Sequence, residues 1–308
     1  MSLKFNLKKG FNINLDGSAI NELGSNFKTN SYAVKPADFI NITRPKLLIE
    51  IGDDVKAGTP ILYDKLQERI MYCSPVSGEV IDIIRGDKRR LEEIRILPDK
   101  QIKFLNHKKY TEKDISKLTR EDLIDHLSKS GVWPNIIQRP FGLVADTNVQ
   151  PKSIHISFFD SSPLAPNFNY IYKDELDSIE FGLSILSKLT DGKIHLNHNS
   201  ESIKCFSNNK YQNNEFSGPH PSGNVGVQIH HVDPVNKNDI VWSTTPYGLI
   251  QIGKLFSKGI YDASKIISLV GSEVDKPKYY KCISGFLVSN LIESNTSGNN
   301  RIISGNVL

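Results

Sequence analysis

The chain has 308 residues, with 38 basic and 34 acidic side chains, a formal net charge of +4 and 38% hydrophobic residues. This composition supplies enough apolar material for packed cores, and the length predicts two or three domains. The small positive excess excludes a strongly basic nucleic-acid-binding protein, and no apolar run approaches the roughly 18 residues of a membrane-spanning helix.

The three cysteines, Cys73, Cys205 and Cys282, are far apart and form no CxxC motif. This pattern lacks the usual signature of iron–sulfur clusters and zinc ribbons, and it favours free thiols in a reducing compartment. The opening segment, MSLKFNLKKGFNINLDG, is interrupted by polar residues too early for a signal peptide. We therefore expect a cytoplasmic protein, which could still sit on a membrane by docking to a protein that spans it.

Residues 47–86 consist of short β-rich runs separated by Gly-Asp, Ala-Gly and Ser-Gly turns, which predicts hairpins. The order of GDDVKAGTPI and SPVSGEVIDIIRGD resembles the barrel-sandwich hybrid of biotinyl and lipoyl carrier domains. In those domains a tight hairpin carries a modified lysine, and Lys65 is the candidate here. The stretch after Lys65 looks longer than such a hairpin, and there is no Met-Lys-Met motif. A surface lysine is the favoured interpretation.

Two different patterns follow within residues 101–150. The segment TREDLIDHLSKSG predicts a short helix that Thr119 caps and that ends before Gly131. The next segment, GVWPNIIQRPFGLVADTN, contains two prolines and an aromatic pair. It predicts a packed loop rather than a regular element.

Residues 153–198 give the clearest α/β signal. In SIHISFF, the apolar residues Ile154, Ile156 and Phe158 alternate with polar positions, which predicts a strand. KDELDSIEFGLSILSKLTDG carries one apolar helical stripe, and KIHLNH predicts a second strand. This order predicts a right-handed βαβ unit with parallel strands.

The remaining segments extend this alternation. The asparagine-rich NNKYQNNEFSG predicts an exposed loop. DIVWSTTP predicts a strand, and Pro246 the start of a helix that ends near Gly259. KIISLVG, KYYKCISG and RIISGNVL predict strands, and FLVSNLIE a helix, which together indicate a small α+β module. Because the chain stops directly after a strand pattern, we also expect that it ends short of its natural C-terminus.

The segment FSGPHPSGNVGVQIHHVDPV, residues 216–235, invites three interpretations. Its glycine spacings fit neither the GxGxxG dinucleotide fingerprint nor a Walker A loop. A metal site would draw on His220, His230, His231 and Asp233, but neither HxxxH nor HxH occurs. Because the prolines stiffen the backbone and the glycines permit close approach, a stiff, close-packed loop is favoured.

Six motifs in chain order resemble one family. They are VKAGTPILYDKLQERIMYCSPVSGEVIDIIRGDKR, GVWPNIIQRPF, LTDGKIHL, GPHPSGNVGVQIHHVDPV, YGLIQIGKLFSKGIY and RIISGNVL. Together they resemble the NqrA family, one of the subunits of the bacterial sodium-pumping NADH:quinone oxidoreductase, from about Lys9 to the end of the chain. The resemblance implies a multidomain α/β and β chain. Its parts would be a barrel-sandwich hybrid domain (residues 1–100), a Rossmann-like domain similar to the complex I flavoprotein subunit (101–257) and an SLBB-type β-grasp module (258–308).

The resemblance also implies a function. The family's complex oxidises NADH, reduces quinone and exports sodium. We expect a peripheral subunit on the cytoplasmic side of the bacterial inner membrane, with the other subunits, especially the integral membrane subunits, as partners. It would contribute to binding or reduction of ubiquinone or menaquinone without a tightly bound redox cofactor, and it would be inactive in isolation. The alternative is a purely structural or assembly subunit.

Cofactor and site expectations follow from the same resemblance. Flavin-binding relatives carry a glycine-rich loop, whereas Trp133, Pro134 and Ile136 would crowd a flavin phosphate here. We therefore expect no FMN and, without the relatives' cysteine motif, no iron–sulfur cluster. No catalytic or metal-binding residue is predicted. The candidate quinone-binding residues lie in the two most distinctive loops and are Trp133, Phe141, His220 and His230.

Overall fold

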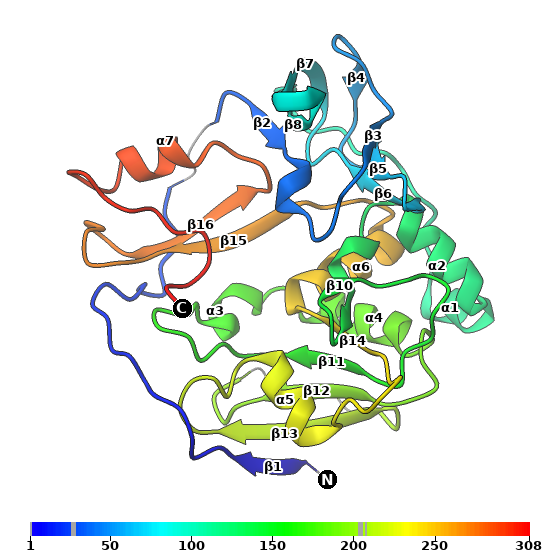
Figure 1. The fold of residues 1–308 in the computed structure, drawn as a ribbon, viewed down its shortest axis with the longest axis vertical. Helices are drawn as coiled ribbons and strands as arrows, with labels where there is room; N and C mark the ends of the chain where they lie inside the picture. Colours follow the sequence, from blue (N-terminus) through cyan, green and yellow to red (C-terminus); the bar gives the residue numbers. More distant parts are fainter. Residues whose placement is uncertain (1, 26–28, 203–205, 207) are drawn as a thin grey trace.

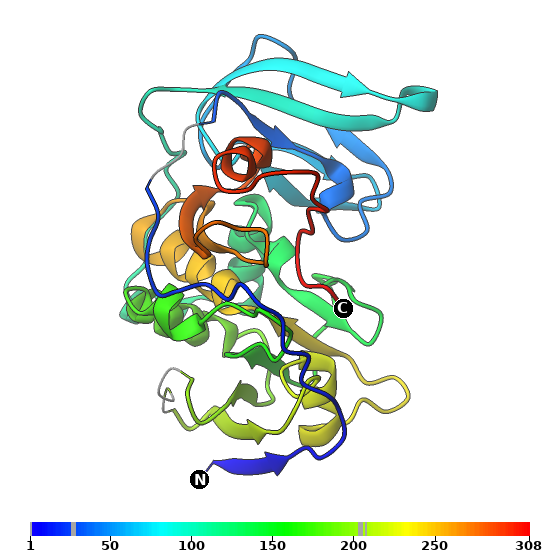
Figure 2. The ribbon, with the colours of Figure 1, turned by 90° about the vertical axis from the view of Figure 1, so that its left-hand side faces the viewer.

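The computed structural model describes residues 2–25, 29–202, 206 and 208–308. A β-rich part occupies one end of the molecule and an α/β part the other, and a small module with two strands and one helix lies beside them (Figures 1 and 2). The chain begins at the far edge of the α/β part. Residues 7–25, called the arm below, then run as an extended segment toward the β-rich part.

The β-rich part consists of two antiparallel sheets with the strand orders β2-β8-β7-β4 and β3-β5-β6. The strands are β2 (Tyr32–Val34), β3 (Pro45–Leu47), β4 (Asp54–Val55), β5 (Pro60–Asp64), β6 (Gln67–Cys73), β7 (Gly78–Arg85) and β8 (Leu91–Pro98). Short 3-10 turns occupy η1 (Pro36–Asp38) and η2 (Asp87–Arg89). Apolar residues from both sheets, including Ile61, Val80 and Ile94, are fully buried, as a barrel-sandwich requires.

Lys65 lies in a tight turn. Strand β5 ends at Asp64 and β6 begins at Gln67, so only Lys65 and Leu66 connect the two strands. The buried Asp64 carboxylate accepts hydrogen bonds from the Leu66 amide at 2.8 Å and the Thr43 amide, which shapes this turn. The expectation of a longer connection after Lys65 is therefore wrong.

The α/β part is built on a seven-stranded sheet with the order β1-β13-β12-β11-β14-β9-β10. Its first five strands are mutually parallel, and β9 and β10 are antiparallel at one edge. The strands are β1 (Leu3–Asn6), β9 (Ile137–Arg139), β10 (Leu143–Val144), β11 (Ile154–Ser157), β12 (Ile194–His198), β13 (Tyr211–Ser217) and β14 (Val241–Thr244). The parallel pairing of β11 with β12 confirms the predicted βαβ unit.

The helices of this part are α1 (Glu112–Lys117), α2 (Arg120–Lys129), α3 (Phe168–Tyr172), α4 (Leu176–Leu186), α5 (Val225–Val232) and α6 (Pro246–Lys258), with a 3-10 turn at η3 (Trp133–Asn135). Helices α1, α2, α3 and α6 each begin after a residue whose side chain caps the first turn. Thr119 and Asp122 form a reciprocal capping box at the start of α2. Helix α6 starts at Pro246 and ends at Lys258, and Gly259, whose φ of 68° lies in the left-handed region, terminates it.

The main core of the α/β part lies where α4 and α6 pack together beneath the sheet. Ile154, Ile156, Ile194 and Leu196 supply the apolar face of β11 and β12, and all four are buried in one cluster with residues of α4 and α6. Glycines permit this close packing, because a Cβ added at Gly253 would lie 1.9 Å from the Ser178 carbonyl oxygen. The helices therefore approach backbone to backbone.

Three sequence predictions are wrong in the α/β part. The segment after Gly131 is not only a packed loop, because it contains η3, β9 and β10. Residues 208–218 are not an exposed loop, since most of them form β13, whose backbone groups pair with β1 and β12 and whose Asn214 is fully buried. Residues 216–235 comprise the end of β13, a tight turn and α5 rather than a loop throughout.

The third module contains β15 (Ser264–Leu269), β16 (Lys278–Ile283) and α7 (Val288–Glu293). Strands β15 and β16 form an antiparallel hairpin, and the arm adds an isolated bridge from Leu23 to Tyr279. Residues 301–308 are irregular and pair with no described strand. The predicted strand at this position is therefore wrong, because a strand requires a neighbour for its backbone groups.

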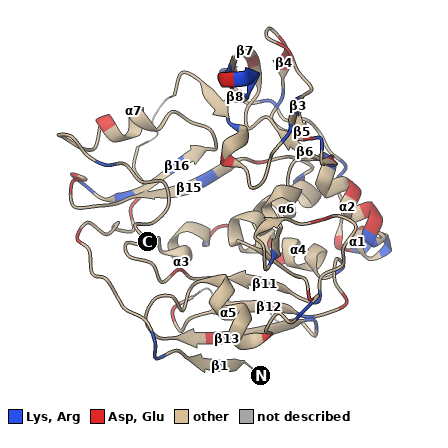
Figure 3. Ribbon diagram, in the orientation of Figure 1, with Lys and Arg blue, Asp and Glu red and all other residues tan. Residues whose placement is uncertain are grey.

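Charged residues of both signs are spread over all three parts (Figure 3). The buried ammonium of Lys254, which is 6% exposed, contacts the carboxylates of Glu175 and Asp262, the latter at 3.0 Å. The two described cysteines, Cys73 and Cys282, are free and buried, as expected for thiols without a redox role. Cys205 lies outside the described residues.

A half-buried histidine makes the stability of the fold dependent on pH. His126 packs edge-on against Phe256, and its burial, together with the nearby His107, lowers its pKa from 6.5 to about 4. Between about pH 4 and pH 6.5, His126 therefore binds a proton in the unfolded chain but not in the folded chain. The free energy of unfolding consequently falls as the pH decreases through this range. We expect His126 to lower the free energy of unfolding by about 1 kcal/mol when the pH is lowered from 6.5 to 5.5.

Urea unfolding followed by tryptophan fluorescence at several pH values measures this effect. The variant His126→Phe keeps an aromatic ring but cannot bind a proton, and its free energy of unfolding should change less over this range. His231→Gln, which removes an exposed imidazole, should keep the wild-type dependence. Equal pH dependence in wild type and His126→Phe would contradict the assignment.

Candidate functional site

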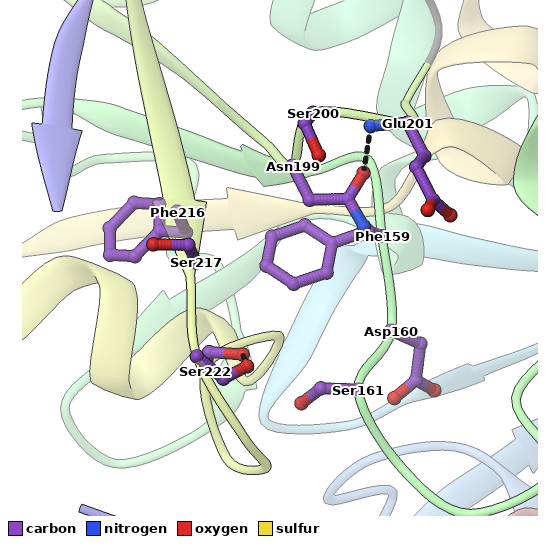
Figure 4. A pocket seen from close by; sticks show the side chains of 10 residues that line it. Phe159, Asp160, Ser161, Asn199, Ser200, Glu201, Phe216, Ser217 and Ser222 are labelled. Atoms are coloured by element: carbon purple, nitrogen blue, oxygen red, sulfur yellow. Dashed lines mark hydrogen bonds between the residues drawn. The ribbon is translucent and has the colours of Figure 1, made fainter. Parts of the chain in front are cut away.

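A pocket of about 270 Å³ opens at the carboxyl ends of β11, β12 and β13 (Figure 4). Each of these neighbouring parallel strands contributes the residues that follow or end it, and the turn before α5 completes the wall. The lining residues are Phe159, Asp160, Ser161, Asn199, Ser200, Glu201, Phe216, Ser217, Gly218 and Ser222. The carboxyl edge of a parallel sheet is where open α/β folds bind their ligands.

Hydrogen bonds around Ser161 hold one wall of this pocket. The Gly223 amide donates to Ser161 Oγ at 2.8 Å, and His220 Nδ1 lies 3.1 Å from the same oxygen. A side chain at position 223 would collide with the chain, because an added Cβ would lie 2.5 Å from the Ser161 nitrogen. The glycine therefore allows the turn before α5 to close onto the loop after β11.

The opposite wall combines an aromatic ring with a polar turn. Phe216, 1% exposed, stacks on Phe5 of the edge strand with ring centroids 4.9 Å apart. Asn199 Oδ1 accepts hydrogen bonds from the Glu201 amide at 3.1 Å and from Ser202 Oγ at 2.6 Å. The pocket therefore presents hydroxyl groups and an amide, together with the carboxylates of Asp160 and Glu201, which disfavour an anionic ligand (Figure 4). The rings of Phe159 and Phe216 also line it but are 9% and 1% exposed.

A second group of polar residues lies beneath α5, on the face of the sheet opposite the apolar core. Its members are buried or nearly so and come from β11, β12, β13 and α5: Ser153, His155, Ser157, His195, Asn197, Asn214 and Gln228. In SIHISFF the polar positions are therefore covered by α5 and do not face solvent. Several atoms of this layer have no hydrogen-bond partner among the described residues, namely His155 Nδ1, Asn197 Nδ2, Asn214 Oδ1 and Gln228 Oε1.

The structure separates the four predicted quinone-binding residues. Trp133 is completely buried, where its Nε1 donates to the Ala145 carbonyl at 2.8 Å and its ring packs edge-on against Trp242. Phe141, at 80% exposure, lies in the turn between β9 and β10. His230 is on the exposed side of α5. His220 adjoins the pocket, because it contacts Ser161 in the pocket wall.

Three domain models of a single family together match most of the length of the chain. The descriptions that match are the NqrA N-terminal barrel-sandwich hybrid domain over residues 5–99, the NqrA second alpha/beta domain over 118–261 and the NQRA C-terminal domain, an SLBB domain, over 266–308. The chain is also 33% identical over 306 residues to the A subunit of the Na(+)-translocating NADH-quinone reductase of Yersinia pseudotuberculosis serotype O:1b. That alignment covers 98% of this chain and 68% of the relative.

The chain belongs to the NqrA family. The corresponding proteins of Pasteurella multocida and Photorhabdus laumondii give similar matches, at 34% and 32% identity over 306 residues. The predicted family and fold class are thereby confirmed. The chain is one subunit of Na(+)-translocating NADH:quinone reductase, an oxidoreductase that transports sodium, and therefore of a membrane respiratory complex. Within the described residues, no helix of this NqrA chain has the length and apolarity needed to cross a bilayer.

Sequence reasoning missed most residues of the NqrA pocket. The strand pattern assigns Phe159 only to the end of a strand, and no motif singles out Asn199 or Glu201. A usable signal existed for two of the three segments, because Phe159–Ser161 and Asn199–Glu201 lie where a predicted strand ends. The loop prediction for residues 208–218 hid β13, so the third strand end was not recognised.

Proposed function

We propose that this chain acts at the quinone end of its complex, with its carboxyl-edge pocket receiving the quinone headgroup. It would sit on the cytoplasmic side of the membrane, docked on the integral membrane subunits. The observation that carries the proposal is the convergence of several neutral hydrogen-bonding groups, with Phe159 beside them, at the ends of three parallel strands. A flat headgroup with two carbonyl oxygens needs an apolar surface and a few polar partners.

His220 is the residue best suited to meet a quinone carbonyl. It is half-buried, and its Nδ1 lies 3.1 Å from Ser161 Oγ in the wall of the pocket. An imidazole N–H or the Ser161 hydroxyl donates to such an oxygen. The burial of Trp133 supports a packing role for that residue instead of ligand contact. Phe141 and His230, both exposed, are proposed to contact the quinone tail or a neighbouring subunit.

The local structure around η3 supports the proposed lack of FMN. The amides of Asn135 and Ile136 donate to the carbonyl oxygens of Val132 and Trp133 within the same turn. Trp133 and Ile136 are both 0% exposed. A phosphate cradle needs free backbone amides directed at open space, and this turn offers neither.

One observation favours the structural alternative, in which the chain only stabilises the membrane subunits. The arm carries apolar side chains that face solvent, including Phe11 at 83% and Ile20 at 57% exposure. Such a series of exposed apolar residues is suited to contact with a partner subunit. Both roles are compatible with the same docking, so the experiment must separate ligand contact from assembly.

Photoaffinity labelling of the intact complex with a quinone analogue tests the proposal. We expect labels in peptides that contain residues 159–161, 199–201 or 216–222. His220→Gln should raise the KM for quinone about fivefold, since one hydrogen bond to the ligand contributes about 1 kcal/mol. NADH oxidation by an artificial acceptor should stay unchanged, as should both activities in the matched control His231→Gln. Labels confined to the membrane subunits, with an unchanged KM, would favour the structural alternative.

A further inference from the structure

Two histidines and an aspartate from three separate segments meet beneath α5. His155 on β11 and His195 on β12 are register partners, so their side chains leave the same face of adjacent parallel strands. Their rings stack with centroids 4.4 Å apart and an interplanar angle of 23°. Asp233 directly follows α5, which lies over this face of the sheet (Figure 1). One ligand atom from each residue lies within 4.8 Å of the other two.

The environment of this cluster leaves coordinating capacity unused. His155 is 0% exposed, and its Nδ1 has no hydrogen-bond partner in the described parts of the chain. Its Nε2 lies 3.3 Å from Ser153 Oγ, which in turn lies 2.9 Å from Asp233 Oδ2. A buried ring nitrogen without a partner costs free energy that a packed protein rarely leaves uncompensated.

We propose that His155, His195 and Asp233 form a binding site for a divalent transition-metal ion, with Zn²⁺ as the expected occupant. Two imidazoles and one carboxylate are a common zinc ligand set, completed by a water molecule or another ligand in the fourth position. Ligand atoms around a tetrahedral zinc ion lie about 3.4 Å apart at metal–ligand distances of about 2.1 Å. The three side chains therefore need only small rotations to close around the ion.

Lys152 is the competitor for this site. Its ammonium contacts Asp233 Oδ1, and it also lies 3.2 Å from Asp239 Oδ2. A bound cation would share the Asp233 carboxylate with the Lys152 ammonium, or it would displace this ammonium toward Asp239, with which Lys152 already forms an ion pair. The side chain of Asp233 is 22% exposed, so an ion reaches the cluster from this side. Removing the lysine charge should therefore strengthen metal binding.

The ion would fix the C-terminal end of α5 to the middle of the sheet. The middle of α5 is tied to the carboxyl end of β11 and to the turn before the helix, because Gln228 Nε2 donates to Ser157 Oγ at 2.9 Å and to the Ser222 carbonyl at 3.1 Å. The turn before α5, which includes Gly218 and Ser222, also forms one wall of the carboxyl-edge pocket. A metal at the far end would thus act as a structural clamp on the element that closes the pocket, independently of what the pocket binds.

Metal binding to the 308-residue chain, treated with a chelator and then dialysed, tests this inference. Zn²⁺ binding is measured by calorimetry, and Co²⁺ is used as a probe because tetrahedral coordination gives it strong visible absorption bands. We expect saturable binding near one ion per chain, and a higher Tm with Zn²⁺ than without it. His195→Gln and Asp233→Asn should each weaken binding by at least about tenfold, while Lys152→Met should strengthen it.

The matched control is His231→Gln, which removes an exposed imidazole from the neighbouring helix without touching the cluster. It should bind Zn²⁺ with wild-type affinity. Circular dichroism of each variant shows whether it is folded, and His195 and Asp233 are chosen over the fully buried His155 to limit misfolding. Absence of saturable binding, or equal affinity in wild type, His195→Gln and Asp233→Asn, would overturn the inference.

Discussion

Replacing Gly253 with alanine is expected to destabilise the protein by about 3 kcal/mol. Alanine has the higher helix propensity, by about 1 kcal/mol, so propensity alone predicts the opposite sign. The structure decides between them, because the added Cβ would lie 1.9 Å from the carbonyl oxygen of Ser178 on α4. The obstacle is backbone, which cannot rotate away, so α4 and α6 must separate. Gly182 faces Leu249 with the same restriction.

Gly226→Ala is the matched control for this prediction. Gly226 also lies in a helix, α5, but an added Cβ there meets nothing within 4 Å. This substitution should stabilise the chain slightly, by about 0.5 kcal/mol. Urea denaturation of both variants measures the two effects with opposite signs. If Gly253→Ala proves as stable as wild type, the close approach of α4 to α6 is incorrect.

The second large effect is expected for Trp133→Ala, which should lower the free energy of unfolding by about 4 kcal/mol. The substitution empties a fully buried site beside Trp242 and also removes the hydrogen bond to the Ala145 carbonyl. The cavity term and the unsatisfied buried oxygen act in the same direction. Thermal and urea unfolding of the purified chain measure the loss.

Trp133→Phe separates packing from ligand contact. It keeps most of the apolar volume and loses mainly the hydrogen bond, so it should cost about 1 to 2 kcal/mol. In the intact complex this variant should leave the KM for quinone unchanged, because the Trp133 ring has no exposed surface. A large rise in KM together with normal stability would return Trp133 to the list of ligand contacts.

Helices and strands were predictable from the sequence where the apolar periodicity agrees with the residues that begin and end an element. The capping box of α2, Pro246 at the start of α6 and Gly259 at its end marked those helices from sequence alone. The alternation of Ile154 and Ile156 marked β11, and the intervening helical stripe led to parallel pairing with β12. The barrel-sandwich and β-grasp parts came from a resemblance to known domains and not from periodicity.

The errors occurred where pairing or packing overrides local composition. Tyr211–Ser217 is polar and asparagine-rich, yet it is a central strand because β1 and β12 satisfy its backbone from both sides. Residues 225–232 follow a run of glycine and proline, and α5 forms there because it covers the polar face of the sheet. Of the predicted site residues, Trp133 proved to be a core residue, since burial depends on contacts with distant segments such as Trp242.

The sequence by itself determined the family, the order of the three parts and the positions of the best-capped helices, because these depend on motifs and on spacing within a few residues. Only the tertiary structure decided which side chains meet. The pocket joins the ends of three strands, and the cluster of His155, His195 and Asp233 joins three segments that are far apart in the chain. Strand register and the path of α5 produce both, and neither is encoded by the spacing of residues within one motif.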